Sequence, residues 1–365
     1  MITTLLLCLI FLGPGYLIGT WLNLDRLRLP YALLYSYATY LVSFYLVAFM
    51  GWSAERMIDI SLGQSIILLA ILFFRGDIRR LYPARKLSFG TWQISAIPEL
   101  IVGMVATIWL ALVGPYLEIP TDVFEHLSRI TDIRENIKHG GFSASFPWYS
   151  AVATALSYSG ESIRQIIWPL TVALTTIFLL SIVSFARAIA ASTALSSTGL
   201  WILLMASPVF TALLFGTSVF SYLRYYVFAP AFLPYLIYLL VGLVVVESMV
   251  NRRQAVSLTE TTTTTGLGLF VSYIVHRQEA LFIAVLVGTA VAYAVVVTLI
   301  KSRKSRTEKL SQSLGIWEIL GVAGIPIVLI CSVLFKFYGT EGESFLLINN
   351  VIDVGKFIGL DRQLL

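Results

Sequence analysis

The sequence predicts an all-α polytopic membrane protein, and three observations support this fold class. The 365-residue chain is 58% hydrophobic and 12% charged, whereas charged residues make up about 25% of a soluble domain. Its mean hydropathy is +0.85. Apolar runs recur at about the twenty-residue length that crosses a bilayer as a helix. The net charge of +5 is therefore expected to reflect basic cytoplasmic loops, and nucleic acid is not expected as a partner.

About ten transmembrane helices are predicted from these runs. The first run lacks a basic leader and a small-residue cleavage site, so it is predicted to be a span and not a signal peptide. Cys8 and Cys331 lie inside apolar runs and are expected to be small buried side chains without a disulfide or a metal. The ten spans cover residues 1–22, 31–50, 57–74, 92–117, 163–187, 194–219, 222–247, 256–275, 280–300 and 316–338.

Charge in the connecting segments predicts the orientation of the spans. One side carries fifteen Lys and Arg residues, concentrated in segments 75–91, 251–255 and 301–315, and the other side carries seven. Because Lys and Arg collect in cytoplasmic loops, the first side is expected to face the cytoplasm. The loop between the fourth and fifth spans, the turn at 276–279 and the tail from residue 339 are then expected to lie outside the cytoplasm.

The charged start of this outer loop predicts an amphipathic helix on the membrane surface. Thr121 is expected to cap a helix that begins at Asp122, and Gly140 and Gly141 are expected to end it. Apolar side chains repeat with the helical period on one face. The apolar positions are Val123, Leu127, Ile130, Ile133 and Ile137.

Two interpretations of the polar face of this helix remain open. Asp122, Glu125 and Arg129 share that face, and His126 lies at its border with the apolar stripe. In the first interpretation the helix is a solvated structural element, and Glu125 and Arg129 form an ion pair that contributes a few tenths of a kcal/mol. In the second, the carboxylates perform chemistry.

The segment 146–160, "FPWYSAVATALSYSG", is too short for a span. Counting it as a span would also invert every later loop. It is expected to be an interfacial or half-inserted helix, with Trp148 and Tyr149 at the level of the lipid headgroups.

The order of these elements resembles the first outer loop of the GT-C-type integral membrane glycosyltransferases. That class includes protein O-mannosyltransferases, aminoarabinose transferases and oligosaccharyltransferase catalytic subunits. Asp122 matches its acidic position after a span, "FPWY" at 146–149 resembles the start of its second loop helix, and "GES" at 160–162 resembles the motif that follows.

The resemblance implies a domain organisation. Residues 1–91 form a three-span N-terminal addition, residues 92–338 form the seven-span GT-C-like module with its outer loop at 118–162, and residues 339–365 form an extracytoplasmic tail. The chain departs from relatives that have adjacent acidic residues, because Asp122 and Glu125 are three apart. It is also shorter than most of them, and an acceptor-binding part is expected to be missing if the chain is truncated.

The resemblance also implies a reaction and its partners. The donor is a sugar on a polyprenyl phosphate, and the acceptor is a protein, a lipid or a polysaccharide. Asp122 is the general base, or it helps to hold a divalent metal such as Mg or Mn. The residues that could bind this metal are Glu125, His126 and Glu279. The residues that could bind the donor phosphate are Arg224, Arg129, His276 and Arg277, with Arg164 as a weaker candidate.

Two other functions compete with this one. A transporter or flippase of lipid-linked glycans should carry charge at mid-membrane, whereas the span interiors here are almost uncharged. A non-catalytic scaffold subunit with membrane-complex partners is the third hypothesis. In each case the expected location is a bacterial or archaeal cytoplasmic membrane, in contact with membrane lipids, and for the enzyme the active face lies outside the cytoplasm.

Overall fold

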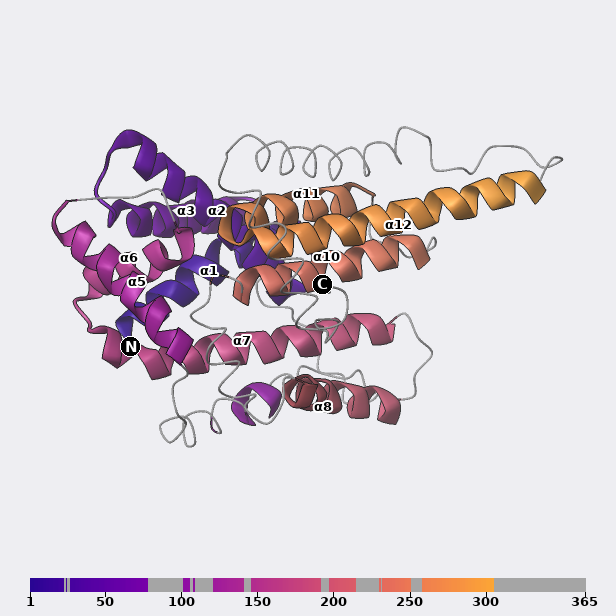
Figure 1. The fold of residues 1–365 in the computed structure, drawn as a ribbon, viewed down its shortest axis with the longest axis horizontal. Coiled ribbons are helices and arrows are strands. Elements are labelled where there is room, and N and C mark those ends of the chain that lie inside the picture. The colour runs from indigo at the N-terminus through magenta and orange to yellow at the C-terminus, as the bar shows by residue number, and fades with distance from the viewer. Residues whose placement is uncertain are drawn as a thin grey trace, which may run out of the picture. The chain divides into compact units, whose positions relative to one another are not determined.

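The computed structural model describes residues 1–22, 24, 27–77, 101–105, 108, 121–140, 146–191, 197–214, 230, 232–250 and 258–304. Within these ranges the regular secondary structure is helical (Figure 1). The helices are α1 (Ile2–Trp21), α2 (Arg28–Met50), α3 (Arg56–Phe74), α5 (Thr121–Lys138), α6 (Pro147–Ser159), α7 (Ile163–Ala191), α8 (Ser197–Leu214), α10 (Phe232–Val250), α11 (Leu258–Val275) and α12 (Arg277–Lys304).

The helices confirm a helical membrane protein. Among the described residues, four apolar stretches are long enough to cross a bilayer, and they lie in α1, α2, α3 and α7. Shorter apolar stretches lie in α8, α10 and α12. Helices therefore occupy eight of the predicted spans. The span at 92–117 is described only at 101–105 and 108, and the span at 316–338 lies outside the described residues, so the count of ten stays a prediction.

The chain divides into two compact units, Met1–Ala280 and Leu281–Leu365. In the first unit α1 packs against α2, α3, α6 and α7, so the first three helices share one core with the later ones. The predicted domain boundaries at 91 and 338 fall on residues outside the described ranges. Of the second unit, the structure describes the part of α12 that follows Ala280.

A glycine sets the closest approach between α1 and α2. A Cβ at Gly15 would overlap the carbonyl oxygen of Ala32 and lie 2.6 Å from the backbone nitrogen of Ser36. The Gly15 N–H donates to the Ser36 hydroxyl at 2.7 Å. Pro14 precedes it inside α1 and lacks an N–H, which weakens the helical ladder at this point. The Pro14–Gly15 step therefore brings the α1 backbone directly against α2.

The predicted orientation assigns each helix end to one of two sides of the membrane. Helix ends assigned to the same side contact one another in the structure. At the predicted cytoplasmic ends, the Arg75 guanidinium lies 5.6 Å from the ring centre of Trp21. The Tyr31 hydroxyl donates to Glu260 at 2.6 Å, which joins the start of α2 to the start of α11. At the predicted outer ends, the N-terminus of α1 meets Glu161. Which group of ends faces the cytoplasm stays a prediction.

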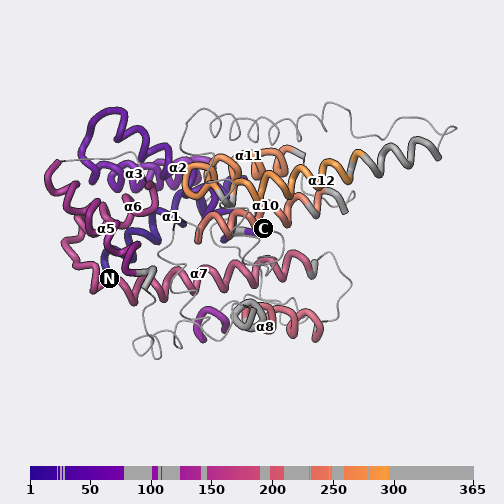
Figure 2. Tube along the Cα trace, in the orientation of Figure 1, coloured from indigo at the N-terminus to yellow at the C-terminus, as the bar shows by residue number. Residues whose placement is uncertain are grey.

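The tight connection predicted at residues 276–279 is shorter than expected. α11 ends at Val275 and α12 begins at Arg277, so His276 alone separates them. Figure 2 traces the described helices along the chain. The His276 N–H still donates to the Ser272 carbonyl at 2.8 Å. α11 starts beside the start of α2 and also contacts α6. His276 therefore lies toward the end of the unit that carries α6.

Candidate functional site

α5 confirms the amphipathic helix that the sequence predicts. It covers Thr121–Lys138, and Gly140 ends it with a φ of 75°, a conformation that glycine adopts readily at the end of a helix. Its apolar stripe packs on α6, beside which it lies in Figure 1. Among the stripe side chains that the structure describes, the buried ones are Leu127, Ile130 and Ile137. The other face of the helix, with Glu125 and Arg129, is exposed.

α6 covers the segment that the sequence predicts as an interfacial or half-inserted helix. It is 13 residues long, so it is confirmed as too short for a span. However, every residue from Pro147 to Leu156 is buried. Trp148 is 2% exposed and Tyr149 is 1% exposed, and the level of the two rings relative to the lipid headgroups stays a prediction. Both rings are enclosed by protein, because α6 packs against α1, α3, α5 and α11.

Aromatic rings hold the start of α6 against α1 and α2. Trp148 lies 5.5 Å from Phe11 of α1, and Phe11 lies 5.3 Å from Tyr40 of α2. The Tyr40 hydroxyl donates to the Pro147 carbonyl at 2.9 Å. Tyr37 stacks on Tyr40 with ring centres 5.9 Å apart and planes 8° from parallel. This aromatic cluster fixes α6 in the interior of the first unit.

His126 connects α5 to α6. Its Nδ1 and the Tyr149 hydroxyl are 2.7 Å apart, and their rings are 5.8 Å apart. Further along, the Arg134 guanidinium donates to the Leu156 carbonyl at 3.2 Å. The buried face of α5 is thus joined to α6 by polar as well as apolar contacts, so the position of α5 is set by α6.

The exposed face of α5 carries ion pairs at helical spacing. Arg129 donates to Glu125 at 2.6 Å, four residues away, and Lys138 donates to Glu135 at 2.6 Å, three residues away. The bond from Lys138 lowers the pKa of Glu135 below its ordinary value. The Arg129 guanidinium also lies 5.8 Å from the ring centre of Phe146, the residue before α6. The polar face of α5 therefore reaches across to the start of α6.

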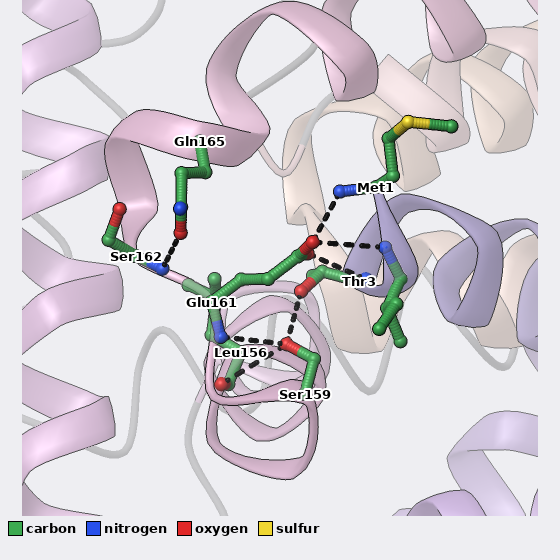
Figure 3. Close-up of polar contacts among 8 residues, drawn as sticks. Met1, Thr3, Leu156, Ser159, Glu161, Ser162 and Gln165 are labelled. Atoms are coloured by element: carbon green, nitrogen blue, oxygen red, sulfur yellow. Dashed lines mark hydrogen bonds and ion pairs between the residues drawn. The ribbon is translucent and has the colours of Figure 1, made fainter.

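Glu161 ties the end of α6 to the start of α1 (Figure 3). Its carboxylate accepts from the backbone N–H groups of Ile2 at 3.1 Å and Thr3 at 3.0 Å, and it pairs with the Met1 amine. These bonds, first that from the amine and then that from Thr3, lower the pKa of Glu161 to about 2. The hydroxyls of Thr3 and Ser159 lie 2.6 Å apart beside it.

The next residues of the same loop cap α7. The Ser162 N–H donates to the Gln165 side chain at 2.7 Å, and the Gln165 N–H donates back to the Ser162 carbonyl at 3.1 Å. This arrangement satisfies N–H groups that the first turn of a helix leaves unpaired. The "GES" motif at 160–162, which resembles a motif of a glycosyltransferase loop, thus contributes hydrogen bonds to the starts of α1 and α7 in this chain.

The structure places only some of the predicted site residues. Asp122 lies in the first turn of α5, and its side chain is outside the described part of the structure. Arg224 lies outside the described residues. Arg277 is exposed and lies 5.9 Å from the ring centre of Tyr273. Glu125, His126 and Arg129 are brought together with α6, and His276 lies toward the same end of the unit. Arg164 lies in the first turn of α7.

The side chains that the structure describes do not form a ligand set for the predicted metal ion. Among them no three His, Cys, Asp or Glu side chains gather closely enough to hold a metal ion. Glu125 is paired with Arg129, His126 is paired with Tyr149, and the Glu279 side chain is outside the described set. A Mg or Mn site stays a prediction, and no chemical step is derived through it.

Sequence reasoning missed the contacts between distant segments in this region, and three of them serve as examples. They are Tyr40 with Pro147, Arg134 with Leu156, and Glu161 with the start of α1. Each joins residues at least 22 positions apart, so no local pattern reveals it. Comparison with protein-family models, curated proteins and solved structures finds no match for the chain.

Proposed function

We propose that the chain is a GT-C-like glycosyltransferase, which moves a sugar from a polyprenyl-phosphate donor to an acceptor outside the cytoplasm. One observation carries the proposal. α5 exposes its polar face while α6, which holds it, is buried among helices that are long and apolar enough to cross a membrane. A rigid polar surface at the ends of such helices suits chemistry on the head of a lipid that stays in the bilayer.

In this proposal the reaction is a displacement at the anomeric carbon of the sugar. Asp122 takes the proton of the acceptor hydroxyl while that oxygen attacks the anomeric carbon. The bond from this carbon to the lipid phosphate oxygen breaks, and the phosphate leaves with the electron pair. Arg129, Arg224, His276 and Arg277 are the candidates to stabilise that charge. The placement of α5 and His276 toward one end of the unit supports their sharing a site.

The test replaces Asp122 in the full chain, reconstituted in vesicles with a polyprenyl-phosphate hexose labelled in the sugar. Asp122→Asn keeps the shape of the side chain and removes the base, so we expect label transfer to fall about a hundredfold or more. Asp132→Asn is the matched control, because Asp132 is an exposed carboxylate on the same helix, and it should leave transfer unchanged. Equal rates for the wild type and Asp122→Asn would falsify the role of Asp122. Label that crosses the bilayer without being consumed identifies a flippase instead.

One observation favours a second candidate, a non-catalytic scaffold subunit. The Glu125–Arg129 ion pair already neutralises two charged groups of the exposed face, as expected for a structural helix. A scaffold predicts that the wild type and Asp122→Asn both fail to transfer label, while a partner protein co-purifies equally with each. The vesicle assay and the purification therefore separate the two candidates.

A further inference from the structure

Phe146 occupies a backbone conformation that a residue with a side chain rarely adopts. Its φ is 57° and its ψ is 65°, in the left-handed region, and it is the one described non-glycine residue with positive φ. This conformation costs free energy for any residue with a Cβ, whereas glycine adopts it freely. Strain of this kind persists where the surroundings impose it, and it often marks a functional position.

Two neighbouring side chains contact the Phe146 ring. The Arg129 guanidinium lies 5.8 Å from the ring centre, within the range of a cation–π interaction. The ring of Tyr149 lies 5.8 Å away at an angle of 45°. Tyr149 is buried and bonded to His126, so the Phe146 ring rests on a fixed support.

The supported ring is nevertheless open to solvent. Phe146 is 52% exposed, so about half of its surface can meet a solute. Arg129, which contacts the ring, and its partner Glu125 are 46% and 63% exposed. A half-exposed apolar ring thus lies next to a guanidinium, which donates hydrogen bonds, and this guanidinium is paired with a carboxylate, which accepts them.

This combination matches the surface chemistry of a pyranose ring. One face of a pyranose presents C–H groups with partial positive charge, which rest favourably on the negative face of an aromatic ring. Its rim presents hydroxyls that donate to a carboxylate and accept from a guanidinium. A lipid-facing anchor would instead need apolar neighbours that can enter the bilayer with it, and an exposed ion pair does not provide them.

We propose that the Phe146 ring, with Glu125 and Arg129, forms a pyranose-binding subsite. The subsite stacks one sugar ring and bonds its hydroxyls, and it deepens the proposed glycosyltransferase function on which it rests. Phe146 is here a binding residue that acts through the face of its ring, and Arg129 both supports the ring and donates to the sugar.

The first experiment measures binding of simple sugars to the full chain in phosphatidylcholine nanodiscs. Methyl mannoside, glucoside and galactoside are the probes, and saturation-transfer NMR reports which of their protons contact the protein. We expect transfer to the ring C–H protons of at least one probe. Phe146→Ala should weaken this binding at least tenfold, whereas Phe146→Trp should retain it. Phe124→Ala is the matched control, because Phe124 is 57% exposed on α5, and it should bind as the wild type does.

A second variant separates binding from folding. Phe146→Gly removes the ring but suits the left-handed backbone, so it should unfold at a temperature equal to or above that of the wild type while losing sugar binding. Binding that survives in Phe146→Ala and Phe146→Gly overturns the proposal. So does the absence of saturation transfer from the wild type to every probe. Quenching of Phe146→Trp fluorescence by lipids brominated on their acyl chains would also overturn it, because the ring would then lie in the bilayer.

The failure of this inference can be told from the failure of the proposed function. Asp122→Asn should abolish label transfer in vesicles and leave sugar binding unchanged. If Phe146→Ala binds sugar normally while Asp122→Asn loses transfer, the subsite is wrong and the enzyme stands. If sugar binding depends on Phe146 while the wild type transfers no label, the subsite stands and the enzyme is wrong.

Discussion

α5 and α6 are neighbours in the chain and in space. The sequence predicts α5 as a surface helix and α6 as an interfacial or half-inserted helix, and the structure holds the two in different ways. α5 buries one stripe and leaves its charged face in solvent. α6 buries ten consecutive residues and shows no exposed face over that length. Short helices beside a membrane therefore need not be surface helices, and the one with aromatic residues at its start is here the interior one.

The difference follows from the side chains that each helix carries. α6 is rich in Ala, Ser and Thr, which allow other helices to approach on every side. α5 alternates apolar and charged residues at the helical period, so only one side can enter the core. If this comparison is right, substitutions in α6 should affect stability far more than substitutions on the open face of α5.

Trp148 should give the largest effect. Trp148→Ala removes a side chain that is 2% exposed and contacts Phe11, so it should lower the free energy of unfolding by about 3–5 kcal/mol. Phe124→Ala on α5 removes a side chain of similar type that is 57% exposed, and it should change stability by less than about 0.5 kcal/mol. Thermal unfolding in detergent micelles, followed by circular dichroism at 222 nm, measures both. Similar losses for the two variants would show that α6 is not the interior helix.

Two stacked tyrosines of α2, near the start of α6, should respond differently to the loss of their hydroxyl groups. Tyr40→Phe removes the hydrogen bond to the Pro147 carbonyl, and it should destabilise the chain by about 1 kcal/mol. The Tyr37 hydroxyl is buried and has no hydrogen-bond partner among the residues that the structure describes. Tyr37→Phe should therefore be neutral or stabilise the chain by up to about 1 kcal/mol.

The same unfolding measurement tests this pair, and each variant is the control for the other. Both variants lose one oxygen from a fully buried ring in the same stack. A loss of stability in Tyr37→Phe as large as that in Tyr40→Phe would contradict the assignment of the bond to Tyr40.

The difference between α5 and α6 also separates what the sequence could predict from what it could not. The limits of α5 were predictable, because the apolar period and the glycines at 140 and 141 are local signals. The apolar runs likewise predicted α1, α2, α3 and α7. The burial of Trp148 was not predictable, because it depends on Phe11 and on Tyr40, which lie more than a hundred positions away.

The left-handed backbone of Phe146 and the long-range contacts of Glu161, at the two ends of α6, were likewise not predictable from the sequence. Positive φ is a signal that the sequence gives through glycine or asparagine, and Phe146 is neither. Glu161 matched a motif by its residue type, but its partners lie at the start of the chain. The candidate site was predictable as a polar helix with Glu125, His126 and Arg129, whereas its connection to α6 required the fold.

Glu161 should give the smallest of the three effects, because its bonds to the start of α1 lie near solvent. Its pKa in the folded chain is lowered to about 2, below its value of about 4.3 in an unfolded chain. The carboxylate therefore contributes stability that is fully present above about pH 4.3 and is lost as the pH falls through about 2.

Glu161→Gln removes this contribution at every pH. The unfolding temperatures of the wild type and Glu161→Gln should differ most near pH 6 and converge toward pH 2. Glu135→Gln on the open face of α5 is the matched control, and its difference from the wild type at pH 6 should be smaller, because the Glu135 carboxylate pairs with a nearby exposed lysine on the same helix. A constant difference between the wild type and Glu161→Gln from pH 6 to pH 2 would show that the charge of Glu161 does not hold α1 to the end of α6.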